Sequence, residues 1–167
     1  ALQSLVNHAM RLCQADSAGV SLAEMEGEKK IFRWHAVAGE LSPFLYGTMP
    51  GDFSPCGEVV SRRSTLLMSN MVRHCSYVEG LGLPLYEVLL VPFFQNDLPI
   101  GTVWTVLHST KRKFEAEDRR LLESLADFTS GISQSYTNMR ELEKTISDLN
   151  TERVMRERLV DTLTHDL

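Results

Sequence analysis

The sequence has few cysteines and no apolar run that could cross a membrane. Its three cysteines, Cys13, Cys56 and Cys75, are widely spaced and form no Cys-x-x-Cys pair. A disulfide framework is therefore not expected, and a reducing compartment is. No apolar run approaches the roughly 20 residues that a bilayer-spanning helix needs, and the N-terminus has the pattern of an amphipathic helix rather than a signal peptide. We expect a cytoplasmic protein with no membrane segment in this sequence.

An excess of basic residues is also missing. The formal net charge is −5, which argues against a broad nucleic-acid-binding face. The composition, 43% hydrophobic and 23% charged, is that of a globular protein rather than a disordered one. At 167 residues the chain has room for one domain of ordinary size and an appendage. No set of residues has the spacing of a metal site.

Proline is absent from residues 116–167, and Gly131 is the only glycine there. The apolar residues of this stretch recur at steps of three and four: Leu125, Phe128, Ile132, Met139, Leu142, Ile146, Leu149, Val160, Leu163 and Leu167. Such spacing over many turns predicts a long helix that forms a parallel coiled-coil homodimer.

The heptad count is regular through Leu149 and then places Arg153 and Arg156 at core positions, where a buried charge is costly. One explanation is ordinary, because coiled coils tolerate a few polar core residues. The other is a register change, in which Met155 and Leu159 form a second seam and the helix switches between two packings. We favour the register change, because a helix that conducts a signal needs two states.

Upstream of residue 116 the pattern predicts five strands, a helix at the start of the chain and two short helices, one of them within the loop at 69–85. The first helix is expected over residues 1–15. A short helix is expected over residues 55–63, with Ser54 as its cap and Pro55 in its first position. The strands are expected at 18–23, 31–38, 65–68, 86–94 and 98–107.

This order of elements predicts an α+β fold, an antiparallel sheet with helices at the two ends of the chain. The end helices are expected to share one face of the sheet. The loops at 39–64 and 69–85 are expected to cover the other face and to leave a concave space. The basic turn at 111–113 is expected to be a solvated loop. On the second strand, one face is expected to carry Phe32, Trp34 and Ala36.

Two segments around the last strand carry a family resemblance. Pro92-Phe93-Phe94 leads into Leu98-Pro99-Ile100-Gly101-Thr102-Val103-Trp104, and Phe114 followed by an acidic pair opens the last helix. Over roughly residues 1–135 the sequence resembles the GAF domain, a small-molecule-sensing relative of the PAS domain. The resemblance implies the fold described above and a ligand pocket within it. The identity of the ligand is left open.

The last ten residues resemble the phosphoacceptor segment of sensor histidine kinases, through Thr164-His165-Asp166-Leu167. The resemblance implies that His165 accepts a phosphoryl group and that Asp166 acts as general base or orients the ring. A neutral imidazole nitrogen can attack the γ-phosphoryl group of ATP. The chain has no glycine-rich phosphate loop. It is therefore expected to be an inactive piece of a longer kinase that uses ATP and magnesium.

These observations divide the chain into a GAF-like sensory domain at 1–135, a coiled-coil signalling helix at 136–157, and the truncated start of the kinase dimerisation helix at 158–167. An input in the pocket would control phosphorylation of His165 and phosphotransfer to the receiver domain of a response regulator. Two alternatives stay open. In one, the chain is a non-catalytic GAF dimerisation or interaction module, and His165 is an ordinary exposed histidine. In the other, it is a GAF-type redox protein that uses Cys56.

The predicted pocket has several candidate residues, each of which also fits ordinary core packing. They are Phe53, Cys56, His74, Tyr77 and Trp104, with Trp34, His35 and Cys75 as further members. The helix dipole could lower the pKa of Cys56, which would suit a redox or covalent-attachment site. Bilin-binding relatives carry a cysteine before a histidine, so the reversed order His74-Cys75 argues against a linear tetrapyrrole. A haem ligand could be His35, His74 or His108, since no spacing singles one out.

Overall fold

The structure, a computed structural model, describes residues 1–73 and 76–165. Within those ranges six side chains are outside the description: Val72, Ser76, Tyr77, Ile132, Ser133 and Tyr136. The chain divides into two compact units, Ala1–Ser130 and Gly131–Leu167. The first unit holds the sheet, and the second holds the later turns of the last helix.

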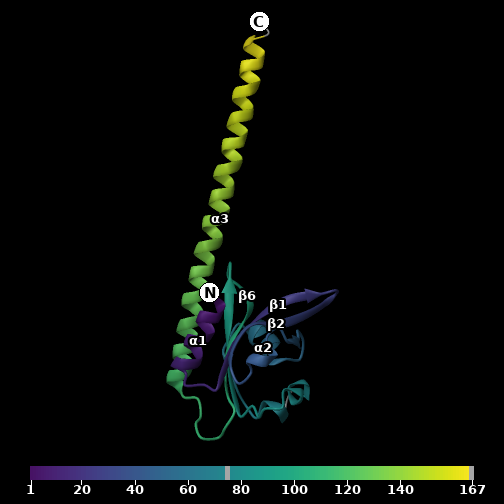
Figure 1. Ribbon diagram of the computed structural model, residues 1–167, viewed down its shortest axis with the longest axis vertical. Coiled ribbons are helices and arrows are strands. Elements are labelled where there is room, and N and C mark those ends of the chain that lie inside the picture. Colours follow the sequence, from purple (N-terminus) through teal and green to yellow (C-terminus); the bar gives the residue numbers. More distant parts are fainter. Residues whose placement is uncertain (74–75, 166–167) are drawn as a thin grey trace. The chain divides into compact units, whose positions relative to one another are not determined.

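The first unit is built on an antiparallel sheet (Figure 1). In the part of the chain that the structure describes, the sheet has six strands in the order β3-β2-β1-β6-β5-β4. The strands are β1 (Ser17–Glu26), β2 (Lys29–Gly39), β3 (Thr48–Pro50), β4 (Leu66–Ser69), β5 (Glu87–Gln95) and β6 (Leu98–Leu107). The five expected strands are all present. The sixth, β3, is too short to have left a pattern in the sequence.

The short helix predicted after Ser54 begins at its capping signal. The helices are α1 (Leu2–Leu12), α2 (Pro55–Arg62) and α3 (Ala116–His165), with short 3-10 helices η1 (Ser42–Phe44), η2 (Met71–Arg73) and η3 (Ser76–Leu81). α2 begins as predicted, because Ser54 Oγ accepts a hydrogen bond from the Gly57 amide at 3.1 Å and Pro55 takes the first helical position. The helix ends at Arg62, and its C-cap Arg63 has a φ of 54°, in the left-handed region.

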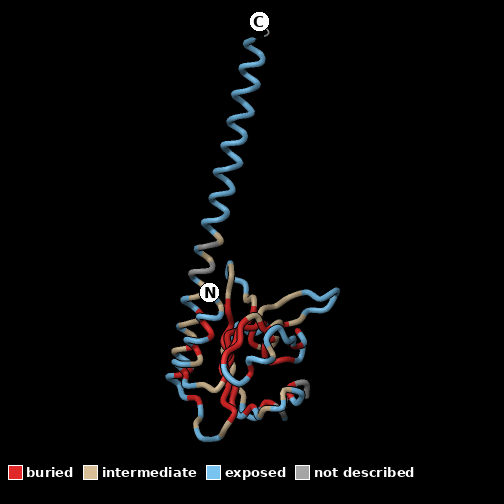
Figure 2. Tube along the Cα trace, in the orientation of Figure 1, coloured by how far each residue is buried: buried red, intermediate tan, exposed pale blue. Residues whose placement is uncertain are grey.

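The sheet separates two apolar cores, seen as buried segments in Figure 2. α1 and the first turns of α3 cover one face, where Val6, Ala9, Leu122 and Ala126 are completely buried against the strands. We call this the helical core. α2, the 3-10 helices and the loops cover the opposite face and form what we call the loop core. The predicted layering, with end helices on one face and loops on the other, is confirmed.

The predicted face of β2 is wrong at Ala36. β1 pairs Val20 with Ala36 and Ser21 with Trp34, so His35 is an extra residue and forms a β-bulge. The extra residue reverses the alternation of side chains beyond it. Trp34 therefore lies in the loop core, whereas Ala36 lies in the helical core.

In the basic turn before α3, Lys111 and Lys113 are exposed as predicted, but Arg112 is not simply solvated, because its guanidinium group is bonded to two other segments. Arg112 Nη1 donates to the Cys13 carbonyl at 2.8 Å, and Nη2 donates to the two carboxylate oxygens of Asp118 at 2.7 and 2.8 Å. Asp118 Oδ2 also accepts from the Glu115 amide at 2.8 Å, which caps the start of α3. One guanidinium group thus joins the end of α1 to the start of α3. Burial, and secondarily the Asp118 carboxylate, raises the pKa of the Cys13 thiol to about 11.

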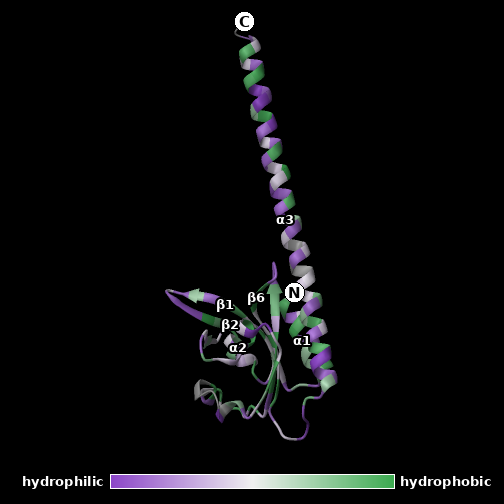
Figure 3. Cartoon of the chain, turned by 180° about the vertical axis from the view of Figure 1, so that it is seen from behind, coloured by the Kyte–Doolittle hydropathy of each residue, from purple (hydrophilic) through white to green (hydrophobic). Residues whose placement is uncertain are grey.

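The second unit is a stretch of helix whose residues 138–165 are all exposed. Figure 3 shows apolar and polar segments following one another along it. Its exposed apolar side chains include Met139, Leu142, Ile146 and Leu149. Ile132 and Leu167, two members of the predicted seam, lie outside the described side chains. Among the described residues, no helix carries an apolar stretch long enough to cross a membrane.

Candidate functional site

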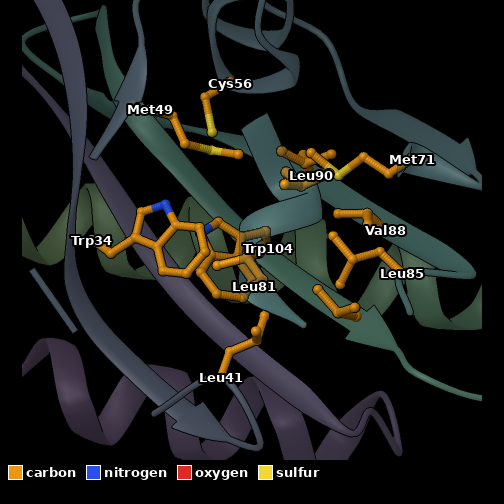
Figure 4. Close-up of a pocket in the computed structure, with 12 residues that line it drawn as sticks. Trp34, Leu41, Met49, Cys56, Met71, Leu81, Leu85, Val88, Leu90 and Trp104 are labelled. Carbon is orange, nitrogen blue, oxygen red and sulfur yellow. The ribbon is translucent and has the colours of Figure 1, made fainter. Parts of the chain in front are cut away.

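The loop core encloses a small cavity against the sheet (Figure 4). Its volume is about 30 Å³, which is room for about two water molecules. The side chains that line it are Trp34, Leu41, Met49, Cys56, Met71, Val78, Leu81, Leu85, Val88, Leu90, Trp104 and Val106. These residues are apolar or weakly polar, so few of them can hold a ligand by hydrogen bonds.

Two tryptophans lie side by side in the cavity wall. The ring centroids of Trp34 and Trp104 are 5.0 Å apart, and the ring planes are tilted by 54°. Aromatic pairs prefer separations and tilts of this kind. Trp104 Nε1 donates a hydrogen bond to Ser21 Oγ at 2.8 Å. The Trp104 ring also lies against Gly19, where a Cβ would come within 2.2 Å of Cζ2. A glycine at position 19 is therefore required for this ring to lie flat on the sheet.

The indole nitrogen of Trp34 differs from that of Trp104 in its hydrogen bonding. The backbone of Trp34 is fixed, because its amide donates to the Gly47 carbonyl and its carbonyl accepts from the Tyr46 amide, both at 2.9 Å. The residue is only 6% exposed, yet Nε1 has no hydrogen-bond partner among the described residues. In Figure 4 this nitrogen lies on the ring edge turned toward Met49. Buried donors without a partner are uncommon in folded proteins.

Cys56 contributes a thiol to the same wall. It is the second residue of α2 and is 1% exposed. Its Sγ lies 3.4 Å from Thr102 Oγ1 on β6, and Thr102 is completely buried. The thiol is therefore shielded from solvent, and a reagent reaches it only when the cavity opens.

The structure brings together only some of the predicted pocket residues. Cys56, Trp34 and Trp104 line the cavity. Phe53 does not, because the chain turns there with a φ of 56° and leaves the ring fully exposed at the rim of an open groove beside α2. His35 does not line the cavity either, and three further candidates lie outside the described residues or side chains: His74, Cys75 and Tyr77.

Neither described candidate for a haem ligand lines the cavity. His35 Nε2 pairs with a carboxylate oxygen of Glu24, and the pKa of Glu24 is lowered by its hydrogen bonds to Arg33 and, to a smaller extent, to His35. His108 Nε2 lies 2.8 Å from Ser17 Oγ, and this buried contact joins β1 to the residue that follows β6. In the described part of the chain, no group of three or more His, Cys, Asp or Glu side chains could hold a metal ion.

Sequence reasoning missed most of the apolar lining. Val88, Leu90 and Val106 could have been found, because alternate residues of a buried strand share a face. The others come from loops, short helices and the strand β3, where no periodicity marks a side chain as inward: Leu41, Met49, Met71, Val78, Leu81 and Leu85.

Strand β5 connects the cavity to α3. Two of its residues line the cavity. At its start, Glu87 Oε1 accepts a hydrogen bond from the Phe114 amide at 2.6 Å, just before α3. Near its end, where the register with β6 shifts, the Phe94 amide donates to Ser130 Oγ on α3 at 3.1 Å. The strand that walls the cavity is therefore fastened at both ends to the segment that carries the first turns of α3.

His165 is the last described residue of α3, and it is exposed. An exposed imidazole can act as a nucleophile toward a group presented by another domain. Asp166, the predicted general base, lies outside the described residues.

Known proteins resemble the chain in family and in fold. The family model of the GAF domain matches residues 1–131. No curated protein matches the chain. Among solved structures, the second GAF domain of DevS from Mycobacterium smegmatis is 20% identical with a TM-score of 0.69, and the match covers 84% of this chain and 96% of that one.

Two further structures have the same fold. The GAF domain of PixJ from Thermosynechococcus elongatus, in its blue-light-absorbing form, is 16% identical with a TM-score of 0.69, covering 89% of this chain and 90% of its own. The GAF domain of a phosphoenolpyruvate-protein phosphotransferase from Acinetobacter is 16% identical with a TM-score of 0.64, covering 82% of each chain. At these identities the similarity shows the fold alone.

GAF domains are sensory and interaction modules that bind small ligands. The family match extends over most of the chain, and the antiparallel sheet with α1 and α3 on one face has the fold of the solved GAF structures. The chain therefore belongs to the GAF domain family.

Proposed function

We propose that this chain is the sensory and dimerisation part of a sensor histidine kinase. The GAF domain, residues 1–135, receives an input in the cavity. Residues 136–157 carry the input as a parallel coiled coil, and residues 158–167 begin the phosphoacceptor helix. His165 takes a phosphoryl group from ATP, which a catalytic domain outside this sequence binds with magnesium. The phosphoryl group then passes to the receiver domain of a response regulator.

The observation that carries this proposal is the attachment of β5 to α3. A ligand that displaces the cavity face of β5 pulls on the Glu87–Phe114 hydrogen bond and on the Phe94–Ser130 hydrogen bond. Either the start of α3 follows the strand or one of these bonds breaks. Because α3 is an unbroken helix over Ala116–His165, a shift at its start is transmitted along its length.

The exposed apolar side chains of α3 support a dimer. Leu142, Ile146 and Leu149 are 60%, 51% and 59% exposed in the single chain. They follow the heptad spacing, so a second copy of the same helix would cover them by packing knobs into holes. In a parallel dimer the two His165 residues lie at the same level, where a catalytic domain of either chain can reach them.

The arginines at the heptad break support a register change. Arg156 Nη2 pairs with Glu152 at 3.0 Å, and Arg153 Nε pairs with Glu157 at 3.5 Å, each within the same helix. These pairs keep both guanidinium groups at the surface of the helix, and burying them in a seam would be costly. A dimer can avoid this cost by using Met155 and Leu159 in a shifted seam, which gives the helix two packings of similar stability.

The chemistry assigned to His165 is phosphoryl transfer. A ring nitrogen in its neutral form attacks the γ-phosphorus of ATP, the bond between that phosphorus and the β,γ-bridging oxygen breaks, and ADP leaves. The proton on the other ring nitrogen is held or taken by the neighbouring carboxylate of Asp166. The phosphorylated imidazole then donates the group to an aspartate of the receiver domain.

The test is autophosphorylation of the longer protein that includes an ATP-binding domain. With ATP labelled in its γ-phosphoryl group, the His165→Gln variant is expected to take up no label, while the wild type does. His8→Gln removes an exposed histidine of α1 and serves as the matched control that keeps full labelling. Labelling of His165→Gln at the wild-type level would show that His165 is not the phosphoacceptor, and the assignment would be wrong.

A further inference from the structure

We propose that the cavity binds a compact, neutral ligand whose polar group is a hydrogen-bond acceptor, and that Trp34 Nε1 donates the bond to it. This inference rests on the proposed role of the cavity as the input site. It adds the chemical class of the input, which neither the family match nor the fold supplies.

The contrast between the two tryptophans points to the acceptor. Both rings belong to one cavity wall, but Trp104 Nε1 has Ser21 Oγ as its acceptor, whereas Trp34 Nε1 has no partner among the described residues. A buried donor that is left unpaired has lost its hydration without gaining a hydrogen bond, which is unfavourable. A ligand acceptor beside Trp34 recovers this cost, and a ligand without an acceptor does not.

The lining of the cavity points to a neutral molecule. The described residues around it include no Asp, Glu, Lys, Arg or His. A charged ligand group would therefore lose its hydration without gaining a counterion, which is strongly unfavourable. The thiol of Cys56 is a weak donor and acceptor that already lies at hydrogen-bond distance from Thr102. Trp34 is thus the strong donor that the lining offers to a ligand.

The size of the cavity points to a compact molecule. A second cavity of about 70 Å³ adjoins the first and shares Trp34, Met49, Val78 and Leu81 with it. Small movements of these side chains would join the two spaces around the Trp34 ring. Even then the volume stays well below the roughly 300–1,000 Å³ of sites for drug-sized ligands, so the ligand is smaller than a nucleotide, a haem or a tetrapyrrole.

Two probes that differ only in an acceptor provide the test. Cyclopentanone carries one carbonyl oxygen, and cyclopentane has the same ring without it. Each is titrated into the full chain while the indole N–H signals are followed by ¹⁵N–¹H NMR. The chain has two tryptophans, and Trp34→Phe assigns the signals because it removes one of them.

Cyclopentanone is expected to shift the Trp34 signal as the hydrogen bond forms, and to shift the Trp104 signal much less. The carbonyl loses hydration when the ketone enters the cavity, so the hydrogen bond is measured by the ratio of the cyclopentanone affinity to the cyclopentane affinity. This ratio should be about tenfold higher in the wild type than in Trp34→Phe, which keeps an aromatic ring but no donor. An unmoved Trp34 signal, or an equal ratio in the two proteins, overturns the assignment.

If Trp34→Phe failed to fold, NOE contacts in the wild type would assign the two indole signals, and the shift of the Trp34 signal would still decide the test. The readout is also independent of phosphorylation. If Trp34 responds to the ketone but His165 is never phosphorylated, the kinase assignment alone is wrong. If His165 is phosphorylated but Trp34 does not respond, the ligand class alone is wrong.

Discussion

The two faces of the sheet are filled in different ways. On the helical face, α1 and α3 bury side chains such as Val6 and Leu122 completely. On the loop face, the same strands meet α2 and loops, and a cavity and an unpaired indole donor remain. One face of the sheet is thus fully packed and stabilises the fold, while the other face leaves space for a ligand.

The two faces are not independent, because alternate residues of strands such as β5 and β6 serve both. On β6, Val103 and Leu107 belong to the helical core, and Trp104 and Val106 belong to the loop core. Protein interiors are close-packed and transmit small displacements. A displacement of this strand on the loop face is therefore felt by the helices on the other face.

The largest effect on stability is expected from creating a cavity in the helical core. Leu122 is completely buried, so Leu122→Ala should lower the free energy of unfolding by about 3 kcal/mol, through lost burial and the cavity left behind. Urea denaturation measures the loss. Leu98→Ala, at a residue that is 64% exposed, is the control and should cost less than about 0.5 kcal/mol. Equal losses in the two variants would show that the helical core is not close-packed.

A smaller effect is expected from crowding the loop core. In Gly19→Ala the new Cβ would lie 2.2 Å from Trp104 Cζ2, so the ring has to move and the unfolding free energy should fall by about 2 kcal/mol. The same denaturation experiment measures it. Gly80→Ala is the matched control, because a Cβ there meets no atom within 4 Å. If the two alanine variants are equally stable, Trp104 is not held against Gly19 in solution.

The smallest effect is expected at the link between the faces. Ser130→Ala removes the acceptor of the Phe94 amide and should cost about 1 kcal/mol. Hydrogen exchange of that amide should become several-fold faster, while amides at the centre of β5 keep their rates. Ser124→Ala, at an exposed position of the same helix, should leave the Phe94 amide unchanged. Unaltered exchange in Ser130→Ala would mean that β5 is not fastened to α3 there.

The sequence was informative wherever local chemistry decides the structure. The cap at Ser54 and the proline after it mark the start of α2, and the bounds of β6 match the expected run of residues 98–107. The two faces of the sheet follow from the order of the elements, because helices at the chain ends and loops in the middle have to cover opposite sides.

The sequence was uninformative wherever contacts between distant residues decide the structure. A single extra residue at His35 reverses one end of β2, and no local pattern marks a bulge. The segment around Arg112 has the composition of a surface turn, but the Arg112 guanidinium donates a hydrogen bond to the carbonyl of Cys13, far away along the chain. The missing partner of Trp34 Nε1 is likewise a property of the assembled cavity, because any indole has the same donor in the sequence.

Both tryptophans of the chain line the cavity. When the protein is excited at wavelengths that only indole absorbs, its emission therefore originates in the cavity wall. With ring centroids 5.0 Å apart, the two indoles exchange excitation energy and behave as one emitter. A molecule that enters between them, or a strand movement that separates them, changes the colour and intensity of that light. The intrinsic tryptophan fluorescence of the domain therefore reports on the state of the cavity without an added label.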